Sequence, residues 1–313
     1  MVVIYTSVDQ VYSEPVLKDF EANTGIKVLA VYDVEAAKTT GLVNRLIAEK
    51  SHPQADVFWN GEFAQTLFLK DQGALQVYAS PSAKDTPSPY VDPVGYWAGT
   101  GGRARIFLVN TQRLSPDRYP ASLQDLLKPD IPGDLIGIAN PLFGTTATQA
   151  AALYALLSPE QARQFYQALR ERGVNMFDGN SVVRDQVVSG RLAVGLTDTD
   201  DACGAIEKSA SVVMVIPDQG EDGFGTLIIP NTVAMIAGAP HPTEAQILID
   251  YLLSQETEAR LVKDGWFQIS LRSPELQPSC LGPKAIRPMR VTLVDLYMQL
   301  STSQKDLAEI FIR

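Results

Sequence analysis

Apolar and polar positions in the N-terminal quarter of the chain come in blocks with two alternating spacings. Short unbroken apolar runs predict buried strands, whereas apolar residues three and four positions apart predict helices with one buried face. Strands and helices that alternate in this order predict a parallel α/β sheet. The expected strands are Val2–Tyr5, Ile26–Tyr32 and Asp56–Trp59, and the expected helices are Glu14–Asn23, Leu42–Ile47 and a segment through Leu67–Leu69.

The same alternation resumes after a loop at residues 79–93 that contains four prolines. It predicts a second α/β unit, with the chain crossing between the units near Gly99–Arg105 and near Ile229–Val233. The expected strands are Arg105–Asn110, Ile136–Ala139, Gly190–Leu196, Val212–Ile216 and Thr232–Ile236. The expected helices are Ser122–Leu127, Thr145–Leu157, Thr243–Leu253, a segment around Thr257–Val262, and Val291–Phe311.

One of these predicted strands leads directly into three carboxylates, Asp198, Asp200 and Asp201. Like charges this close raise one another's pKa unless a cation, a hydrogen-bond donor or water relieves them. The segment could be a solvated acidic turn, because clustered charges usually lie on the surface. Its position at the end of a buried strand favours a second interpretation, in which it lines a ligand site.

Composition narrows the function classes. The chain has 313 residues, 45% of them hydrophobic and 20% charged, which is typical of a globular protein with two cores. A net charge of −10 argues against nucleic-acid or anionic-membrane partners. His52 and His241 are the two histidines and each precedes proline, which excludes a histidine-rich metal site. Common nucleophile, zinc-protease and phosphate-loop motifs are missing, so we expect no enzyme.

Cys203 and Cys280 allow one disulfide, and two buried thiols are an equal alternative. No run of about 18 apolar residues predicts a membrane-spanning helix. No secretory signal sequence precedes the strand-like run Val2–Tyr5, which fits either a cytosolic protein or a mature exported domain that has lost its signal.

Several segments follow one another in an order and spacing that is more specific than any one of them. They are Thr24–Val28, Ala55–Trp59, Gly102–Thr111, Ser122–Leu127, Asn180–Val182 and Gly190–Gly195. Together they resemble type II extracellular solute-binding proteins of ABC importers over nearly the whole chain. The most similar branch is the ferric-iron-binding one, although this chain has no Tyr-Tyr pair.

The resemblance implies a two-lobed α/β protein, each lobe a mixed sheet flanked by helices, with the ligand cleft between the lobes. It implies lobe 1 at residues 1–100 and 233–275, and lobe 2 at residues 101–232 and 276–313. It further implies a monomer that is periplasmic, or extracellular and tethered to the membrane, and that delivers its ligand to an ABC permease. No nucleic acid is expected as a partner.

Ligands of open α/β sheets bind beyond the carboxyl ends of the strands. Each candidate there also has a structural alternative: a plain turn, a helix N-cap or, for the tryptophan, the core. Helix starts favour anions, and in the iron-binding relatives the helix start equivalent to residues 144–146 holds an anion that the residue matching Asn180 supports. The candidates are Ser7, Asp9, Thr39, Thr40, Trp59, Glu62, Gly144, Thr145, Thr146 and Asn180, with Asp198, Asp200 and Asp201.

The resemblance places Asp200 and Asp201 where the iron-binding relatives have their metal-binding tyrosines. Carboxylates bind hard cations, but they also accept hydrogen bonds from ammonium groups and polyols. The leading hypothesis is therefore a solute-binding protein for a small ligand that carries both signs of charge. The alternatives are ferric or other metal binding through Asp200 and Asp201 with an accompanying anion, and an enzyme on the same fold. No resident cofactor is expected apart from such a metal ion.

Overall fold

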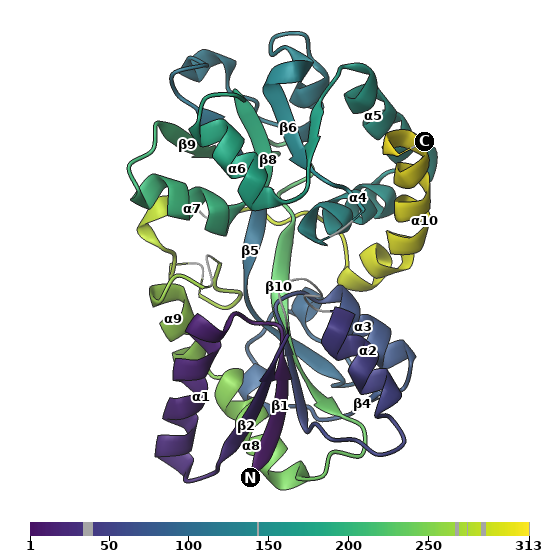
Figure 1. The fold of residues 1–313 in the computed structure, drawn as a ribbon, viewed down its shortest axis with the longest axis vertical. Helices are drawn as coiled ribbons and strands as arrows, with labels where there is room; N and C mark the ends of the chain where they lie inside the picture. Colours follow the sequence, from purple (N-terminus) through teal and green to yellow (C-terminus); the bar gives the residue numbers. More distant parts are fainter. Residues whose placement is uncertain (34–39, 143, 267–268, 274, 283–285, 313) are drawn as a thin grey trace. The chain divides into compact units, whose positions relative to one another are not determined.

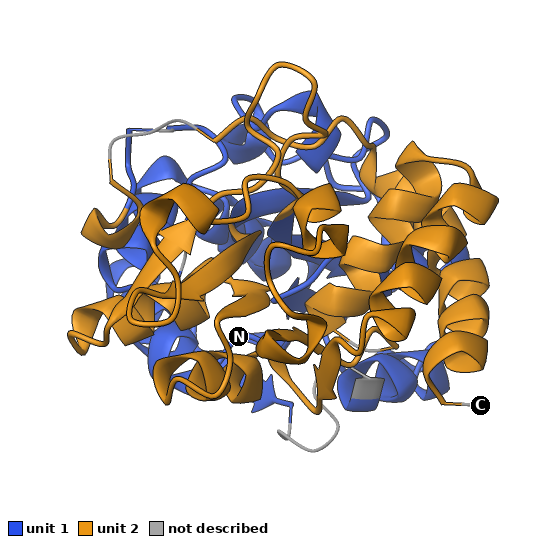
Figure 2. Ribbon diagram, turned by 90° about the horizontal axis from the view of Figure 1, so that it is seen from above, with its two compact units in different colours: residues 1–102, 229–277 blue, residues 103–228, 278–313 orange. Residues whose placement is uncertain are grey.

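A computed structural model of the chain describes residues 1–33, 40–142, 144–266, 269–273, 275–282 and 286–312 (Figure 1). It has a mixed α/β fold, which confirms the predicted fold class. The chain divides into two compact units, unit 1 with Met1–Gly102 and Ile229–Gln277, and unit 2 with Arg103–Ile228 and Pro278–Arg313 (Figure 2). Among the helices that the structure describes, none combines the length and the apolar character needed to cross a membrane.

Unit 1 is built on a sheet in which β1 lies between two parallel neighbours, β2 and β3, while β10 pairs antiparallel with β3. Its core contains apolar side chains of these strands and of the helices that cover them, including Ile4, Phe20 and Leu248. The elements are β1 (Val2–Thr6), α1 (Gln10–Thr24), β2 (Val28–Tyr32), α2 (Thr40–Ala48), β3 (Val57–Asn60), α3 (Ala64–Asp71), β4 (Leu75–Gln76), η2 (Pro81–Ala83), η3 (Ser88–Tyr90), β10 (Ile228–Ile236), α8 (Pro242–Leu252) and α9 (Gln255–Lys263).

Unit 2 begins within the long strand β5, which pairs antiparallel with β8 and β9, while β6 pairs parallel with both β8 and β7. The elements are β5 (Trp97–Asn110), η4 (Pro116–Arg118), η5 (Leu123–Leu127), η6 (Gly133–Leu135), β6 (Ile136–Ala139), α4 (Gly144–Leu156), α5 (Pro159–Glu171), β7 (Asn175–Phe177), α6 (Asn180–Val188), β8 (Val194–Asp198), α7 (Thr199–Glu207), β9 (Val212–Val215), η7 (Ser279–Leu281) and α10 (Leu293–Phe311).

The three parallel strands β6, β7 and β8 are each followed by a helix, α4, α6 and α7 respectively. The carboxyl ends of parallel strands lie at one edge of a sheet, so three helix N-termini start from the same edge of unit 2. Two glycines on the neighbouring strands β6 and β8 leave room for side chains that pack over the sheet. A Cβ on Gly195 would come within 2.5 Å of Val183 on α6, and one on Gly137 within 2.4 Å of Leu192.

The structure corrects the strand prediction in this region. We expected a strand at Gly190–Leu196, but β8 spans Val194–Asp198, so Asp198 is a strand residue, and Asp200 and Asp201 lie in the first turn of α7. Three helices, α5, α6 and α7, were not predicted. For α5 a signal was present, because Ser158 and Gln161 form a capping box ahead of a helical spacing of apolar residues.

A disulfide joins Cys203 on α7 to Cys280 on η7, with the two Cα atoms 5.3 Å apart. This resolves the alternative that the sequence left open. The bond links two segments of unit 2 that are 77 residues apart, so it ties the helix that carries Asp200 and Asp201 to the C-terminal part of the chain.

We predict that breaking this bond destabilises unit 2. Closing a loop of this length contributes on the order of 4 kcal/mol in the chain-entropy description, with typical measured values of about 2–4 kcal/mol. Chemical denaturation of the protein with and without a thiol reductant measures the loss. The Cys203→Ser/Cys280→Ser variant is the control, because the reductant should leave its unfolding midpoint unchanged. Equal stability of the oxidised protein and the double variant would contradict the prediction.

Candidate functional site

The polar edge of unit 2, defined here as the carboxyl ends of β6, β7 and β8 with the first turns of α4, α6 and α7, gathers most of the predicted site residues. The first backbone N–H groups of a helix have no partner within the helix, and its dipole places partial positive charge there. Three such N-termini at one edge favour the binding of an anion.

Arg105 forms the centre of this edge. It comes from β5 and its side chain is only 1% exposed. Its guanidinium Nη1 donates hydrogen bonds to Asp198 Oδ1 at 2.7 Å, Thr145 Oγ1 at 3.0 Å and Asn180 Oδ1 at 3.1 Å, and Nη2 donates to Thr146 Oγ1 at 3.3 Å. One buried cation therefore holds the ends of β8, α4 and α6 together.

The carboxylate of Asp198 is the counter-charge of Arg105. Its second oxygen, Oδ2, accepts hydrogen bonds from Thr145 Oγ1 at 2.7 Å and Asn180 Nδ2 at 3.0 Å, and it lies 3.6 Å from Arg103 Nε. Both oxygens are thus engaged by neighbouring side chains. In this arrangement Asp198 positions Thr145 and Asn180. Both oxygens of its carboxylate already have hydrogen-bond partners within the protein.

Asp201 is engaged in a similar way. Its Oδ1 pairs with Arg184 Nη1 at 3.0 Å, and its Oδ2 accepts a hydrogen bond from Thr197 Oγ1 at 2.8 Å. Burial, reinforced by the charges of Asp200 and Asp198, raises the pKa of Asp201 from its usual 3.8 to about 7. Asp200, one residue earlier on α7, is the exposed member of the trio.

The acidic trio is matched by three guanidinium groups, those of Arg103, Arg105 and Arg184. These arginines were not among the residues predicted for the site. A signal was available, because Arg103 and Arg105 are the two charged residues of a largely buried strand, and a buried charge in such a strand requires a partner. The edge is therefore an electrically balanced cluster, rather than the bare group of carboxylates that the sequence suggested.

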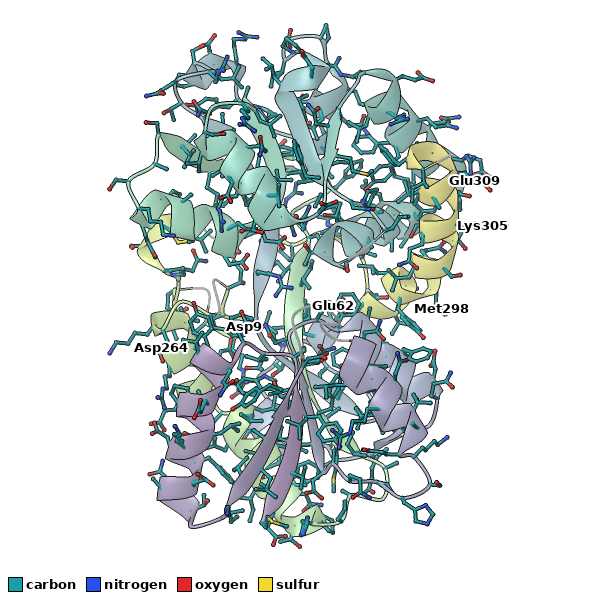
Figure 3. The ribbon with its side chains drawn as sticks, viewed as in Figure 1. Asp9, Glu62, Asp264, Met298, Lys305 and Glu309 are labelled. Atoms are coloured by element: carbon teal, nitrogen blue, oxygen red, sulfur yellow. A yellow bond between two sulfur atoms is a disulfide. The ribbon has the colours of Figure 1, made fainter. Side chains whose placement is uncertain are left out.

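Unit 1 contributes a second set of candidates at the ends of β1 and β3. The Ser7 hydroxyl donates to Asn60 Oδ1 at 2.6 Å and accepts a hydrogen bond from the Gly61 backbone N–H at 3.0 Å. It therefore ties together the two loops that follow these strands. Asp9 is the N-cap residue of α1, and Glu62 Oε2 accepts the Ala64 backbone N–H at 2.8 Å; Figure 3 labels both acidic side chains.

Trp59 requires a correction. Trp59 is a candidate for the ligand site in the sequence, with the core as its alternative, and its side chain is fully buried in the core of unit 1, where it packs with residues such as Ile4 and Val57. Strand β3 is buried along its whole length, so Trp59 points into the core and we remove it from the candidate site. Thr40 begins α2, and Thr39 lies outside the described residues.

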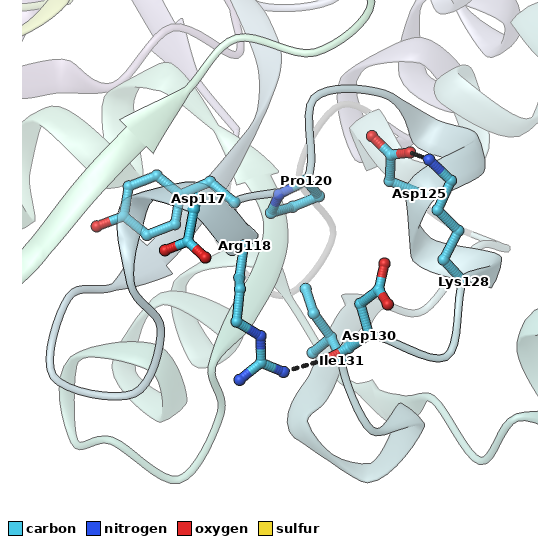
Figure 4. A pocket seen from close by; sticks show the side chains of 8 residues that line it. Asp117, Arg118, Pro120, Asp125, Lys128, Asp130 and Ile131 are labelled. Carbon is cyan, nitrogen blue, oxygen red and sulfur yellow. Dashed lines mark hydrogen bonds and ion pairs between the residues drawn. The ribbon is translucent and has the colours of Figure 1, made fainter.

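A hollow of about 530 Å³ lies elsewhere on unit 2 (Figure 4). Its lining segment precedes β6, so it lies toward the opposite end of that strand from the polar edge. Arg118 donates to the backbone carbonyl oxygen of Asp130, and Lys128 pairs with Asp125 at 2.6 Å, so both cations of this hollow have partners within the protein. We assign it no role.

Comparison with known proteins identifies the family. The profile of a family described as "Bacterial extracellular solute-binding protein" matches residues 1–267. A "Probable ABC transporter periplasmic-binding protein" of Sinorhizobium fredii is 28% identical over 229 residues, which cover 70% of this chain and 61% of that protein. The chain thus matches less than two thirds of the length of that relative.

Two further proteins are similar to this chain. A "Putative 2-aminoethylphosphonate-binding periplasmic protein" of Salmonella typhimurium is 25% identical, covering 79% of this chain and 71% of its own. A solved ferric binding protein from Campylobacter jejuni superimposes with a TM-score of 0.87 at 21% identity, covering 99% of both chains, which shows a shared fold. The chain belongs to the bacterial extracellular solute-binding protein family.

Proposed function

We propose that this protein captures a small solute carrying a phosphonate or phosphate group and delivers it to an ABC permease. The observation that carries the proposal is the polar edge of unit 2, where three helix N-termini meet around buried Arg105. Oxyanions are stabilised by backbone N–H groups at helix starts and by guanidinium groups. Membership of a solute-binding family supports transport rather than catalysis.

Arg103 is the proposed contact for the oxyanion. Its side chain is 19% exposed, in contrast to the 1% of Arg105, so it combines a fixed position beside Asp198 with access to a ligand. Thr145, Thr146 and Asn180 belong to the same hydrogen-bond network and begin α4 and α6. We propose that their helix starts supply the N–H groups that surround the anion.

Asp200 is the proposed contact for a positive group on the ligand, because it is the exposed carboxylate of the trio. A ligand with both charges is consistent with the relative that is described as binding 2-aminoethylphosphonate. Among the other predicted residues, Ser7, Asp9 and Glu62 remain proposed ligand contacts on unit 1.

Binding of a metal ion with an accompanying anion is the second candidate, favoured by the likeness to a ferric binding protein. In this chain the proposed metal ligands would be Asp200 and Asp201. Two observations weigh toward the organic ligand: the oxygens of Asp201 are held by Arg184 and Thr197, and a nearby guanidinium opposes a trivalent cation. In the described ranges, no three His, Cys, Asp or Glu side chains are grouped closely enough to hold a metal ion.

We further propose that the protein works as an exported monomer, periplasmic or extracellular and tethered to the membrane. The disulfide supports this location, because such bonds persist in oxidising compartments. The relatives are described as periplasmic.

The first test is a thermal-shift screen with phosphate esters, phosphonates, polyamines, sugars and ferric citrate. We predict that phosphonates or phosphate esters raise the melting temperature, since a ligand at 100 times its Kd stabilises the folded state by about 2.7 kcal/mol. Elemental analysis of protein purified without chelator is the companion measurement. Stoichiometric iron, with stabilisation by ferric citrate alone, would favour the metal candidate instead.

The Arg103→Ala substitution should weaken binding of the stabilising phosphonate about 10- to 100-fold, because hydrogen bonds to charged groups contribute about 1.5–3 kcal/mol. Isothermal titration calorimetry measures the change. Arg191→Ala is the matched control, since Arg191 is an exposed arginine of the same unit that contacts Gln186. Equal affinities of the two variants would remove Arg103 from the site.

The raised pKa of Asp201 predicts a pH dependence of stability. Between the unfolded value near 3.8 and the folded value of about 7, the folded state binds the extra proton. The free energy of unfolding should therefore fall as pH rises through this window, by at most about 1.4 kcal/mol per pH unit from this group. In urea denaturation from pH 4.5 to 8, the free energy of unfolding should fall less for the Asp201→Asn variant than for the unmodified protein. Asp185→Asn is the control, because Asp185 pairs with the same Arg184 but is 65% exposed. If the free energy of unfolding of both variants fell with pH as steeply as that of the unmodified protein, Asp201 would not cause the pH dependence.

A further inference from the structure

We infer that the disulfide between Cys203 and Cys280 positions the proposed ligand contact on α7, because it fixes the direction in which the Asp200 side chain leaves the helix. The inference rests on the proposed function and deepens it. It makes the selection of solutes with a positive group dependent on the redox state of this bond. All three residues belong to unit 2.

Helix α7 depends on its attachments to neighbouring segments. It has 9 residues, and isolated helices shorter than about 12–15 residues are marginally stable in water. Among the described residues, the Asp198 side chain forms no cap hydrogen bond with this helix. The buried side chains of α7 are small, so apolar burial contributes little to holding it; they are Thr199, Ala202, Cys203 and Ala205. The orientation of α7 is therefore set by specific bonds.

Asp200 lies between two of these bonds around the helix axis. An α-helix turns by about 100° per residue, so Asp201 stands about 100° from Asp200 on one side and Cys203 about 60° from it on the other. On the first side, Asp201 pairs with Arg184 at 3.0 Å and accepts a hydrogen bond from Thr197 at 2.8 Å. On the second side, the disulfide is a covalent attachment. With both in place, α7 cannot rotate about its axis without breaking one of them.

The other end of the disulfide is firmly anchored. Cys280 lies in η7, next to the buried side chain of Leu281. Further along the same segment, Arg287 Nη2 donates to the carbonyl oxygens of Asp218 at 2.7 Å and Gly223 at 2.9 Å. The bond therefore joins α7 to a segment that other contacts hold in unit 2.

The bond can be reduced from the side of Cys280. Cys203 is buried, whereas Cys280 is partly exposed. A dithiol supplies the two electrons: its thiolate attacks the Cys280 sulfur and releases Cys203 as a thiolate, which takes up a proton. The second thiolate of the reagent then closes the reagent's own disulfide and releases Cys280 in the same way. The reduced protein keeps Asp200 but loses the attachment on one side of it.

The test measures the preference of the full chain for 2-aminoethylphosphonate over n-propylphosphonate, in which a methyl group replaces the ammonium. The preference is the ratio of the two dissociation constants from calorimetric titration. We expect dithiothreitol to lower this ratio about 3- to 30-fold in the unmodified protein. The Cys203→Ser/Cys280→Ser variant should show the low ratio with and without the reductant. Circular dichroism and thermal melting confirm that each form is folded.

The Asp200→Asn variant shows whether the disulfide acts through Asp200. Its preference should already be low, and dithiothreitol should lower it no further, because both changes remove the same contact. A reductant effect of equal size in Asp200→Asn and in the unmodified protein would overturn the inference. Reduction that weakens both ligands to the same degree would also overturn it, since a general loss of stability has that result.

Hydrogen exchange tests the positioning without a ligand. Reduction should speed amide exchange in α7 about 10-fold and leave α5, in the same unit, unchanged. Unchanged exchange in α7 would overturn the inference and leave oxyanion capture standing. Equal binding of the two phosphonates by the oxidised protein would do the same, because there would be no ammonium contact to position. Failure of both phosphonates to bind would overturn the proposed function and, with it, this inference.

Discussion

The buried ion pair between Arg105 and Asp198 determines the arrangement of the polar edge of unit 2. Removing one partner of such a pair costs about 3–5 kcal/mol, because the other charge is left buried without compensation. The pair is satisfied from several sides, since Thr145 and Asn180 bond to both members. The starts of α4 and α6 are thus held in place by a cluster that is complete without ligand, which reduces the reorganisation that binding would require.

The remaining charges of this edge follow from that pair. Arg105 is neutralised inside the cluster, whereas Arg103 is held beside Asp198 with part of its side chain exposed to solvent. Asp200 lies in the first turn of α7. An acidic first turn also stabilises its own helix dipole, so Asp200 and Asp201 contribute to the folding of α7 whatever they bind. Asp200 therefore both stabilises α7 and is the proposed ligand contact.

Hydrophobic patterning was sufficient to predict the mixed α/β class, and it placed strands such as β6 at the residues where they occur. It failed where the signal is not local. The position of Arg105 in a buried strand indicates that it needs a partner, but its partners lie 40 to 93 residues away in the sequence, so the pattern does not identify them. Trp59 was misassigned because a strand end can face the core or the solvent, and only the packing of unit 1 decides which. The disulfide was likewise undecidable until the fold brought Cys203 and Cys280 together.

The paired glycines Gly137 and Gly195 have a consequence for how such a protein can diversify. They are register partners on β6 and β8, and a Cβ at Gly137 or Gly195 would come within 2.4 or 2.5 Å of a neighbouring side chain, which would have to move. The backbone platform beneath the polar edge therefore tolerates little gradual adjustment. The first turns of the helices above it carry side chains that can be exchanged one at a time. A new ligand preference is accordingly most accessible through replacements at residues such as Asp200, on a platform whose geometry stays constant.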